Sequence, residues 1–197
     1  DKLEIERLAG VFRDSGGEIR AVLRAMFLSD HFKSDAVRFR KIKSPAELVW
    51  GVVRLAGRYT LPELDVCDLP NYSTYMGQML LNPPSVEGWH EGEEWVDSGA
   101  LVERVNFAVN ELDRVESRGV QRMVDRVKAT GKDLHPEEFL AACLDVLGGT
   151  DVSPRTKRIL LDTAAKGGML STTSAEAGDR IVEMLQMIVA TPDFQYC

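Results

Sequence analysis

The stretch at residues 82–107 constrains the fold most, because it separates two segments with helical periodicity. Pro83 and Pro84 fix the backbone angle φ and remove two amide donors, so a helix before them has to end. Trp89 and Trp95 then bring two large aromatic surfaces that need packing partners. The stretch is therefore predicted to form one long, ordered loop between two helices.

Elsewhere, apolar residues recur at helical spacing, and no segment alternates between apolar and polar residues as a strand does. Ser44, Pro45 and Glu47 predict a capping box at one helix start, and Thr173 with Glu176 predicts another. The fold class predicted is all-α, an irregular helical bundle of about eight or nine helices with one long ordered Pro/Gly/Trp loop. The predicted helices span residues 2–13, 18–29, 45–56, 70–81, 98–116, 120–129, 136–147, 154–166 and 173–191.

A chain of 197 residues suits a single helical domain. Within it, residues 1–116 are predicted to form a core on which C-terminal helices at 117–197 pack. The chain begins at Asp1 inside a helical pattern, without an initiator methionine, so it is expected to be a fragment of a longer protein.

The net charge of -7 argues against nucleic acid as a partner, because phosphate binding needs a positive surface. A short basic run at Arg38, Arg40, Lys41 and Lys43 is interpreted as a solvated linker, with a phosphate or partner patch as the alternative. No apolar run approaches the roughly 20 residues that span a bilayer, so no membrane insertion is predicted for this chain.

The three cysteines are too few and too scattered to predict a disulfide framework. Cys143 lies on the apolar face of a predicted helix and is expected in the core. A bridge between Cys67 and Cys197 has no support in the sequence, and no cofactor is predicted.

Residues 19–32 (IRAVLRAMFLSDHF) and 181–194 (IVEMLQMIVATPDF) share isoleucine, leucine and phenylalanine at matching places. Helical periodicity alone makes any two amphipathic helices align in this way. The shared ending, a small polar residue followed by phenylalanine, is not required by periodicity. If the similarity is an internal repeat, it implies paired helices, since two copies are too few for an array.

The order of motifs along the chain resembles one family. These motifs are Ser44-Pro45, Met76-Gly77-Gln78, Pro83-Pro84, Gly88-Trp89, Gly92, Trp95, Ser98, Arg104, Asn106-Phe107 and Asp193-Phe194-Gln195. They resemble the C-terminal part of the bacterial family catalogued as domain of unknown function 1800. The resemblance covers residues 17–107 and the last dozen residues, whereas residues 115–175 agree in composition and order only.

The resemblance implies a helical fold and a protein that is exported to the periplasm or cell surface, although this chain has no signal segment. It implies no particular reaction. In that family a proline more usually follows the Gly-Trp pair, whereas this chain has His90 there. His90 is therefore not expected to perform a function that the family shares.

The candidate site residues lie in and just after the loop. A metal site is not predicted, because the spacing of His90, Glu91 and Glu94 is neither the HExxH pattern of zinc sites nor the alternation of a calcium loop. A saccharide site would use the two tryptophan rings for stacking and two carboxylates as acid and base. The favoured interpretation is structural: the tryptophans fill the gap between two helices, and Arg104 pairs with Glu94 or Asp97 to hold the loop closed. The candidate binding residues are Trp89, His90, Glu91, Glu94, Trp95 and Arg104.

The sequence therefore predicts a non-catalytic helical module of a larger exported bacterial protein, with a structural or binding role and no catalytic residue assigned. The alternative is an enzyme or binding protein for cell-surface carbohydrate that uses the acidic Gly-Trp loop. The expected partner is another protein or a carbohydrate. A docking surface would show as an exposed apolar patch.

Overall fold

The structure is a computed structural model, which describes residues 1–59, 61 and 64–197. The described residues contain ten α-helices, three short 3-10 helices and one pair of two-residue strands, so the predicted all-α class is confirmed. They form two compact units, residues 1–40 with Cys197 and residues 41–196. The single-domain organisation, with its division after residue 116, stays a prediction. No helix in the described part of the chain is long and apolar enough to span a membrane.

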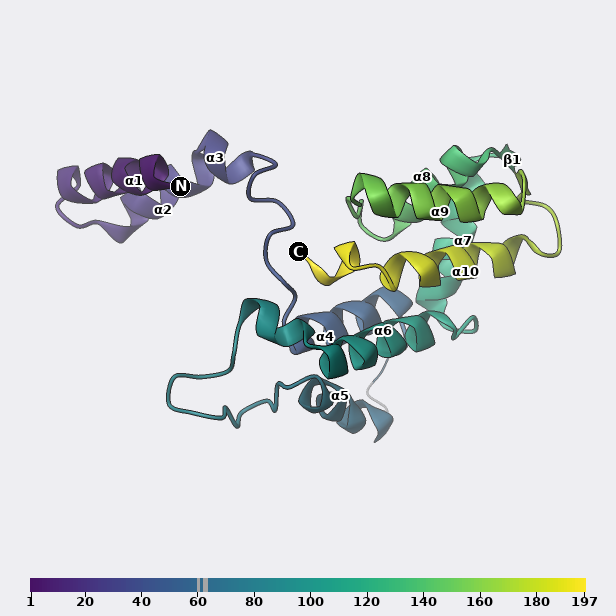
Figure 1. Ribbon diagram of the computed structural model, residues 1–197, viewed down its shortest axis with the longest axis horizontal. Helices are drawn as coiled ribbons and strands as arrows, with labels where there is room; N and C mark the ends of the chain where they lie inside the picture. The colour runs from purple at the N-terminus through teal and green to yellow at the C-terminus, as the bar shows by residue number, and fades with distance from the viewer. Residues whose placement is uncertain (60, 62–63) are drawn as a thin grey trace. The chain divides into compact units, whose positions relative to one another are not determined.

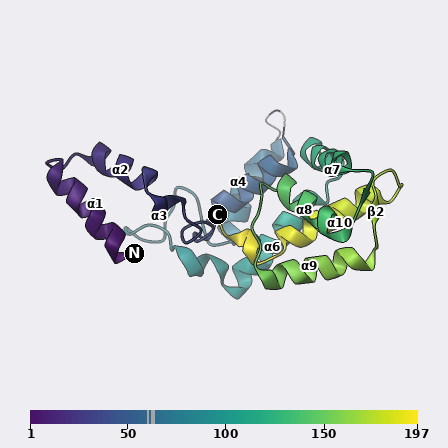
Figure 2. The same cartoon turned by 90° about the horizontal axis from the view of Figure 1, so that it is seen from above.

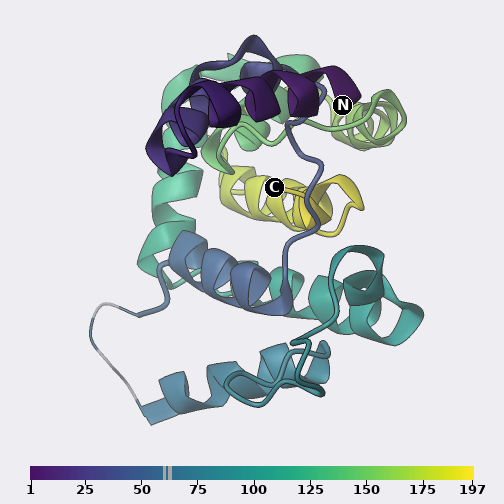
Figure 3. The ribbon, with the colours of Figure 1, turned by 90° about the vertical axis from the view of Figure 1, so that its left-hand side faces the viewer.

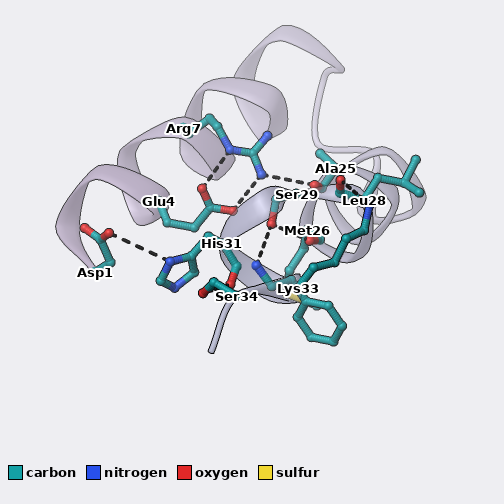
Figure 4. A network of polar contacts seen from close by, with 11 residues as sticks. Asp1, Glu4, Arg7, Ala25, Met26, Leu28, Ser29, His31, Lys33 and Ser34 are labelled. Atoms are coloured by element: carbon teal, nitrogen blue, oxygen red, sulfur yellow. Dashed lines mark hydrogen bonds and ion pairs between the residues drawn. The ribbon is translucent and has the colours of Figure 1, made fainter. Parts of the chain in front are cut away.

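The first unit contains α1 (Lys2–Asp14), α2 (Ile19–Leu28) and the short α3 (Asp30–Lys33), which was not predicted. Arg7 joins α1 to α2, because its guanidinium donates to both carboxylate oxygens of Glu4 and, at 3.0 Å, to the carbonyl of Ala25 (Figure 4). The hydrogen bond from Arg7 lowers the pKa of Glu4 to about 2. All residues of the three helices are described and none is buried, and apolar side chains such as Val11, Val22 and Met26 are half-buried, so this unit has only a small core.

The second unit contains seven α-helices among its described residues. Helix α10 lies between the α4–α6 pair and the α8–α9 pair (Figures 1 and 3). Helices α7 and α9 flank it when the unit is seen from above (Figure 2). The elements are α4 (Pro45–Ala56), η1 (Leu64–Asp68), α5 (Leu69–Tyr75), η2 (Gly92–Val96), α6 (Ser98–Leu112), α7 (Arg118–Thr130), β1 (Asp133–Leu134), α8 (Pro136–Val146), α9 (Pro154–Lys166), β2 (Leu170–Ser171), α10 (Ala177–Val189) and η3 (Asp193–Gln195).

The core of the second unit forms around α10, whose apolar stripe faces the neighbouring helices. Burying each large aliphatic side chain contributes about 1.5–3 kcal/mol relative to leaving it in water. The most deeply buried apolar residues include Leu48, Val49, Leu112, Val127, Leu140, Cys143, Ile181, Leu185 and Ile188.

Helices α4 and α7 approach each other through their backbones at Gly119. A Cβ atom at this position would lie 2.3 Å from the carbonyl oxygen of Leu55 and equally close to the carbonyl carbon of Ala56. Gly57 ends α4 in the left-handed conformation, with φ of 62°. Only glycine at position 119 allows α7 to begin so close to the end of α4.

Two sequence predictions are wrong near β2. Leu134 and Leu170 pair in an antiparallel two-residue sheet, although no strand was predicted. The expected capping box does not form: α10 begins at Ala177, and its N-cap Glu176 makes no side-chain capping bond. Thr173 lies before the start of α10 with its hydroxyl 3.4 Å from that of Ser171, and the neighbouring Thr172 donates to the carbonyl of Gly131 at 2.8 Å. This segment therefore bonds to β2 and to a distant part of the chain rather than to its own helix.

The cysteines lead to the first testable prediction. All three are free, and the structure confirms that Cys143 is in the core while Cys67 and Cys197 are exposed. Burial raises the pKa of the Cys143 thiol to about 12, and the thiol rather than the reactive thiolate is therefore present at pH 8. We expect two cysteines to react rapidly with a thiol reagent in the native protein, and the third only after denaturation. Rapid labelling of all three would contradict the packing around Cys143.

Candidate functional site

Helix α5 ends at Tyr75, earlier than the predicted end near residue 81. Gly77 has a φ of 96°, a backbone conformation that a continuing α-helix cannot contain. The amide of Gly77 donates to the carbonyl of Thr74 at 2.9 Å and closes the last turn. The loop therefore begins at residue 76, whereas the prolines alone indicate a start at residue 82.

The two tryptophans of the loop between α5 and α6 have different surroundings, and that both fill the gap between two helices stays a prediction. The side chain of Trp95, in η2, is buried, with only 5% of its surface exposed. Trp89 is half-buried, and its indole nitrogen donates to the carbonyl of Met79 at 3.0 Å. A tight turn in between is closed by a hydrogen bond from the amide of Gly88 to the carbonyl of Ser85. The predicted ordered loop is confirmed.

A cleft of about 350 Å3 opens where this loop meets α5 and α6. The imidazole Nδ1 of His90 pairs with the carboxylate of Glu94 at its edge. Asp97 serves the fold as well, because its carboxylate accepts from the amide of Ala100 at 2.8 Å and caps α6. The lining residues are Tyr75, Met76, Gly77, His90, Glu94, Trp95, Asp97, Gly99 and Ala100.

The structure thus brings three of the six predicted binding residues, His90, Glu94 and Trp95, to one cleft. Trp89 and Glu91 do not line it. Tyr75 also lines the cleft and is 69% exposed, although it was not among the predicted binding residues. An aromatic residue next to the helix-ending glycine was the available signal.

The predicted pairing of Arg104 with Glu94 or Asp97 is wrong. Arg104 is fully buried, its Nε donates to the side-chain oxygen of Gln195 at 2.8 Å, and its Nη2 donates to the carbonyl of Lys43 at 2.7 Å. Burial lowers the pKa of Arg104 to about 10. Arg104 therefore joins α6 to the segment before α4 and to the C-terminal turn, and does not touch the loop carboxylates.

We expect Arg104→Ala to reduce the free energy of unfolding by about 3 kcal/mol, because it removes two hydrogen bonds from a charged donor and leaves a cavity. Glu103→Ala, at the neighbouring exposed position of α6, is the matched control and should change stability by less than about 0.5 kcal/mol. Urea unfolding of both variants measures the difference. If the Arg104→Ala and Glu103→Ala variants are equally stable, the hydrogen bonds of Arg104 do not stabilise the fold.

A second charged cluster lies between the end of α4, η1 and α6, and the sequence analysis did not find it. Arg58 donates to the buried carboxylate of Glu111 at 2.7 Å and also pairs with Asp65. Burial raises the pKa of the adjacent Tyr59 to about 12, which keeps the phenol neutral. These contacts join the end of α4 to η1 and to α6, and their role is structural.

In the part of the chain that the structure describes, no three histidine, cysteine or acidic side chains lie close enough together to hold a metal ion.

The fold and the cleft define a helical protein with a small polar and aromatic cleft. Its family follows from comparison of the sequence with family models. The chain belongs to the protein family of unknown function DUF1800, whose model matches residues 2–196. The match extends the resemblance into residues 115–175, which agreed before only in composition and order. Neither a curated protein nor a solved structure matches the chain.

Proposed function

We propose that this protein is a non-catalytic helical module that binds a ligand in the cleft between α5 and α6. The observation that carries this proposal is the composition of the cleft, which is lined by the exposed Tyr75, the buried Trp95 and the polar side chains of His90, Glu94 and Asp97. An ordered loop presents these groups, so little conformational entropy is lost on binding.

The carboxylates support binding more than catalysis. Acid–base cleavage of a glycosidic bond needs two carboxyl groups in unlike environments, one of them shielded from water so that it stays protonated. Glu91 is exposed, and the side chain of Glu94 is 63% exposed and paired with His90. Asp97 is engaged as the N-cap of α6. Neither glutamate has the shielded environment of a general acid.

Carbohydrate is the ligand class that the cleft favours. Aromatic rings stack on the apolar faces of sugars, and carboxylates accept hydrogen bonds from sugar hydroxyls. Tyr75 supplies the first kind of contact, and the exposed carboxylate of Glu94 supplies the second. Nucleic acid is not proposed as a ligand, given the net charge of -7.

Isothermal titration of the protein with a panel of soluble neutral and amino-sugar oligosaccharides tests this proposal. We expect one of them to bind with a Kd in the micromolar to millimolar range, and Tyr75→Ala and Glu94→Gln to weaken binding about ten-fold or more. Glu87→Gln, an exposed loop position outside the cleft, is the matched control.

Unchanged binding in Tyr75→Ala would show that the cleft is not the site, and no binding across the panel would reject carbohydrate. An assay for new reducing ends tests the enzyme alternative. If the native protein releases reducing ends and the Glu94→Gln variant does not, the protein is a glycoside hydrolase and not a binding module.

We further propose that the module is part of a longer exported bacterial protein of the periplasm or cell surface. The resemblance described above supports this proposal. Fractionation of bacteria that express the parent protein with an epitope tag tests it, with a cytoplasmic marker as control. Recovery of the tag in the cytoplasmic fraction alone would reject export.

A further inference from the structure

The similarity between residues 19–32 and 181–194 extends to the hydrogen bonds that end both helices. In the first segment, the hydroxyl of Ser29 donates to the carbonyl of Met26 at 2.7 Å and accepts from the amide of Phe32 at 3.1 Å. This turn follows α2 directly and leads into α3.

In the second segment, the hydroxyl of Thr191 donates to the carbonyl of Ile188 at 2.7 Å and accepts from the amide of Phe194 at 3.3 Å. Ile188, Thr191 and Phe194 stand at the same positions of residues 181–194 as Met26, Ser29 and Phe32 do of residues 19–32. Helical periodicity accounts for matching apolar positions but not for a matching turn after the helix, so the two segments form a structural repeat.

The helix before each segment fits the same repeat. Helices α1 and α9 are both 13 residues long, and each contacts the helix that follows it. The residue before the shared phenylalanine lies at the N-cap of this preceding helix in both copies. His31 approaches the carboxylate of Asp1 to 3.9 Å, and Asp193 accepts from the amide of Ser153 at 2.9 Å. The chain therefore contains two copies of one helical hairpin.

The second copy shows what covers such a hairpin. Ile181, Leu185 and Ile188 of α10 are completely buried, and α6 is one of the helices that contact α10. The side-chain amide of Gln186 donates to the carboxylate of Asp113, just after α6, at 3.1 Å. A helix with apolar residues and a carboxylate near its C-terminal end thus covers this hairpin.

In the first copy the matching residues are exposed. The exposed fractions are 61% for Ile19, 43% for Leu23 and 50% for Phe27, which match Ile181, Leu185 and the buried Val189. Arg24 stands at the place of Gln186. A shallow groove of about 470 Å3 runs along this surface, the α2 face, which consists of Arg20, Leu23, Arg24, Phe27 and Leu28.

We propose that the α2 face binds an amphipathic helix of a separate partner protein, in the way that α6 packs on α10. The partner helix presents an apolar stripe to Leu23 and Phe27 and a carboxylate to Arg24. An apolar groove flanked by cations fits such a helix, because the apolar stripe leaves water while the charges pair at the rim.

The test uses the full chain and a helix of known sequence. The probe is a fluorescein-labelled peptide of residues 97–113, cross-linked between positions 103 and 110, which are exposed in the protein, so that it is helical. Fluorescence anisotropy should show binding with a Kd in the micromolar range. Leu23→Glu and Arg24→Glu should each weaken binding about ten-fold or more, since they place a charge in the groove or repel the carboxylate. Arg158→Glu, which makes the same change of charge at an exposed position of α9, is the control.

A peptide with Asp113→Lys should bind the Arg24→Glu protein better than the native peptide does. This result would distinguish the charge contact from non-specific hydrophobic binding. Failure of the peptide to bind, once circular dichroism shows it to be helical, would overturn the proposal. So would binding that neither variant weakens, because the peptide would then be replacing α6 in the second unit. Concentration-dependent dimerisation that Leu23→Glu abolishes would assign the α2 face to a second copy of the chain instead.

Discussion

Gly119→Ala is expected to lower the free energy of unfolding by about 3 kcal/mol, the upper part of the range for overpacked sites. The added methyl would lie 2.3 Å from backbone atoms of Leu55 and Ala56, and backbone at a helix end cannot rotate away as a side chain can. The two helices must separate, which exposes the side chains between them. Chemical denaturation followed by circular dichroism measures the loss.

The same substitution at Gly51 provides the control. Gly51 lies inside α4, and a Cβ atom there meets nothing within 4 Å. Because alanine is the better helix former, Gly51→Ala is expected to stabilise the protein by about 0.5–1 kcal/mol. A Gly119→Ala protein as stable as Gly51→Ala would show that α4 and α7 are further apart than described.

Trp95→Ala is expected to have the other large effect, a loss of about 3–5 kcal/mol, because it empties the space of a buried indole. Trp95 is 5% exposed and lies beside Gly77, so its ring fills the base of the cleft and supports the loop. The variant should also lose ligand binding, since the wall under His90 and Glu94 is removed.

Trp89→Phe is the matched comparison for the loop. It keeps an aromatic ring and removes one hydrogen bond to the carbonyl of Met79, so a loss of about 1 kcal/mol is expected. If the two substitutions have equal effects on urea unfolding, the two tryptophans share the support of the loop and Trp95 is not its main anchor.

Local signals predicted the helix starts well. The capping box of Ser44 and Glu47 forms as predicted, with the serine hydroxyl accepting from the amide of Glu47 and the carboxylate accepting from the amide of Ser44. The proline and glutamates after His135 also mark a true start, that of α8. Such motifs are predictable because donor and acceptor lie within a few residues, and sequence spacing then nearly determines geometry.

Long-range contacts were not predictable in this way. Gln195, 91 residues from Arg104 along the chain, accepts a hydrogen bond from it, whereas the predicted partners Glu94 and Asp97 do not. The pairing of β1 with β2 joins segments that have no strand pattern of their own. Tyr75 became a cleft residue because α5 ends at the left-handed Gly77. Each outcome depends on which segments meet in space, which periodicity does not specify.

The partners of Arg104 have a consequence for the order of events during synthesis. Its guanidinium is bound by a carbonyl at residue 43 and by a side chain at residue 195, so a ribosome makes the first partner long before the second. Until residue 195 leaves the exit tunnel, this cation stays hydrated and its contact with η3 cannot form. Helices α4 to α9 are therefore expected to stay loosely packed, with apolar surface exposed to chaperones, during this part of synthesis. They pack fully only after α10 and η3 have been translated.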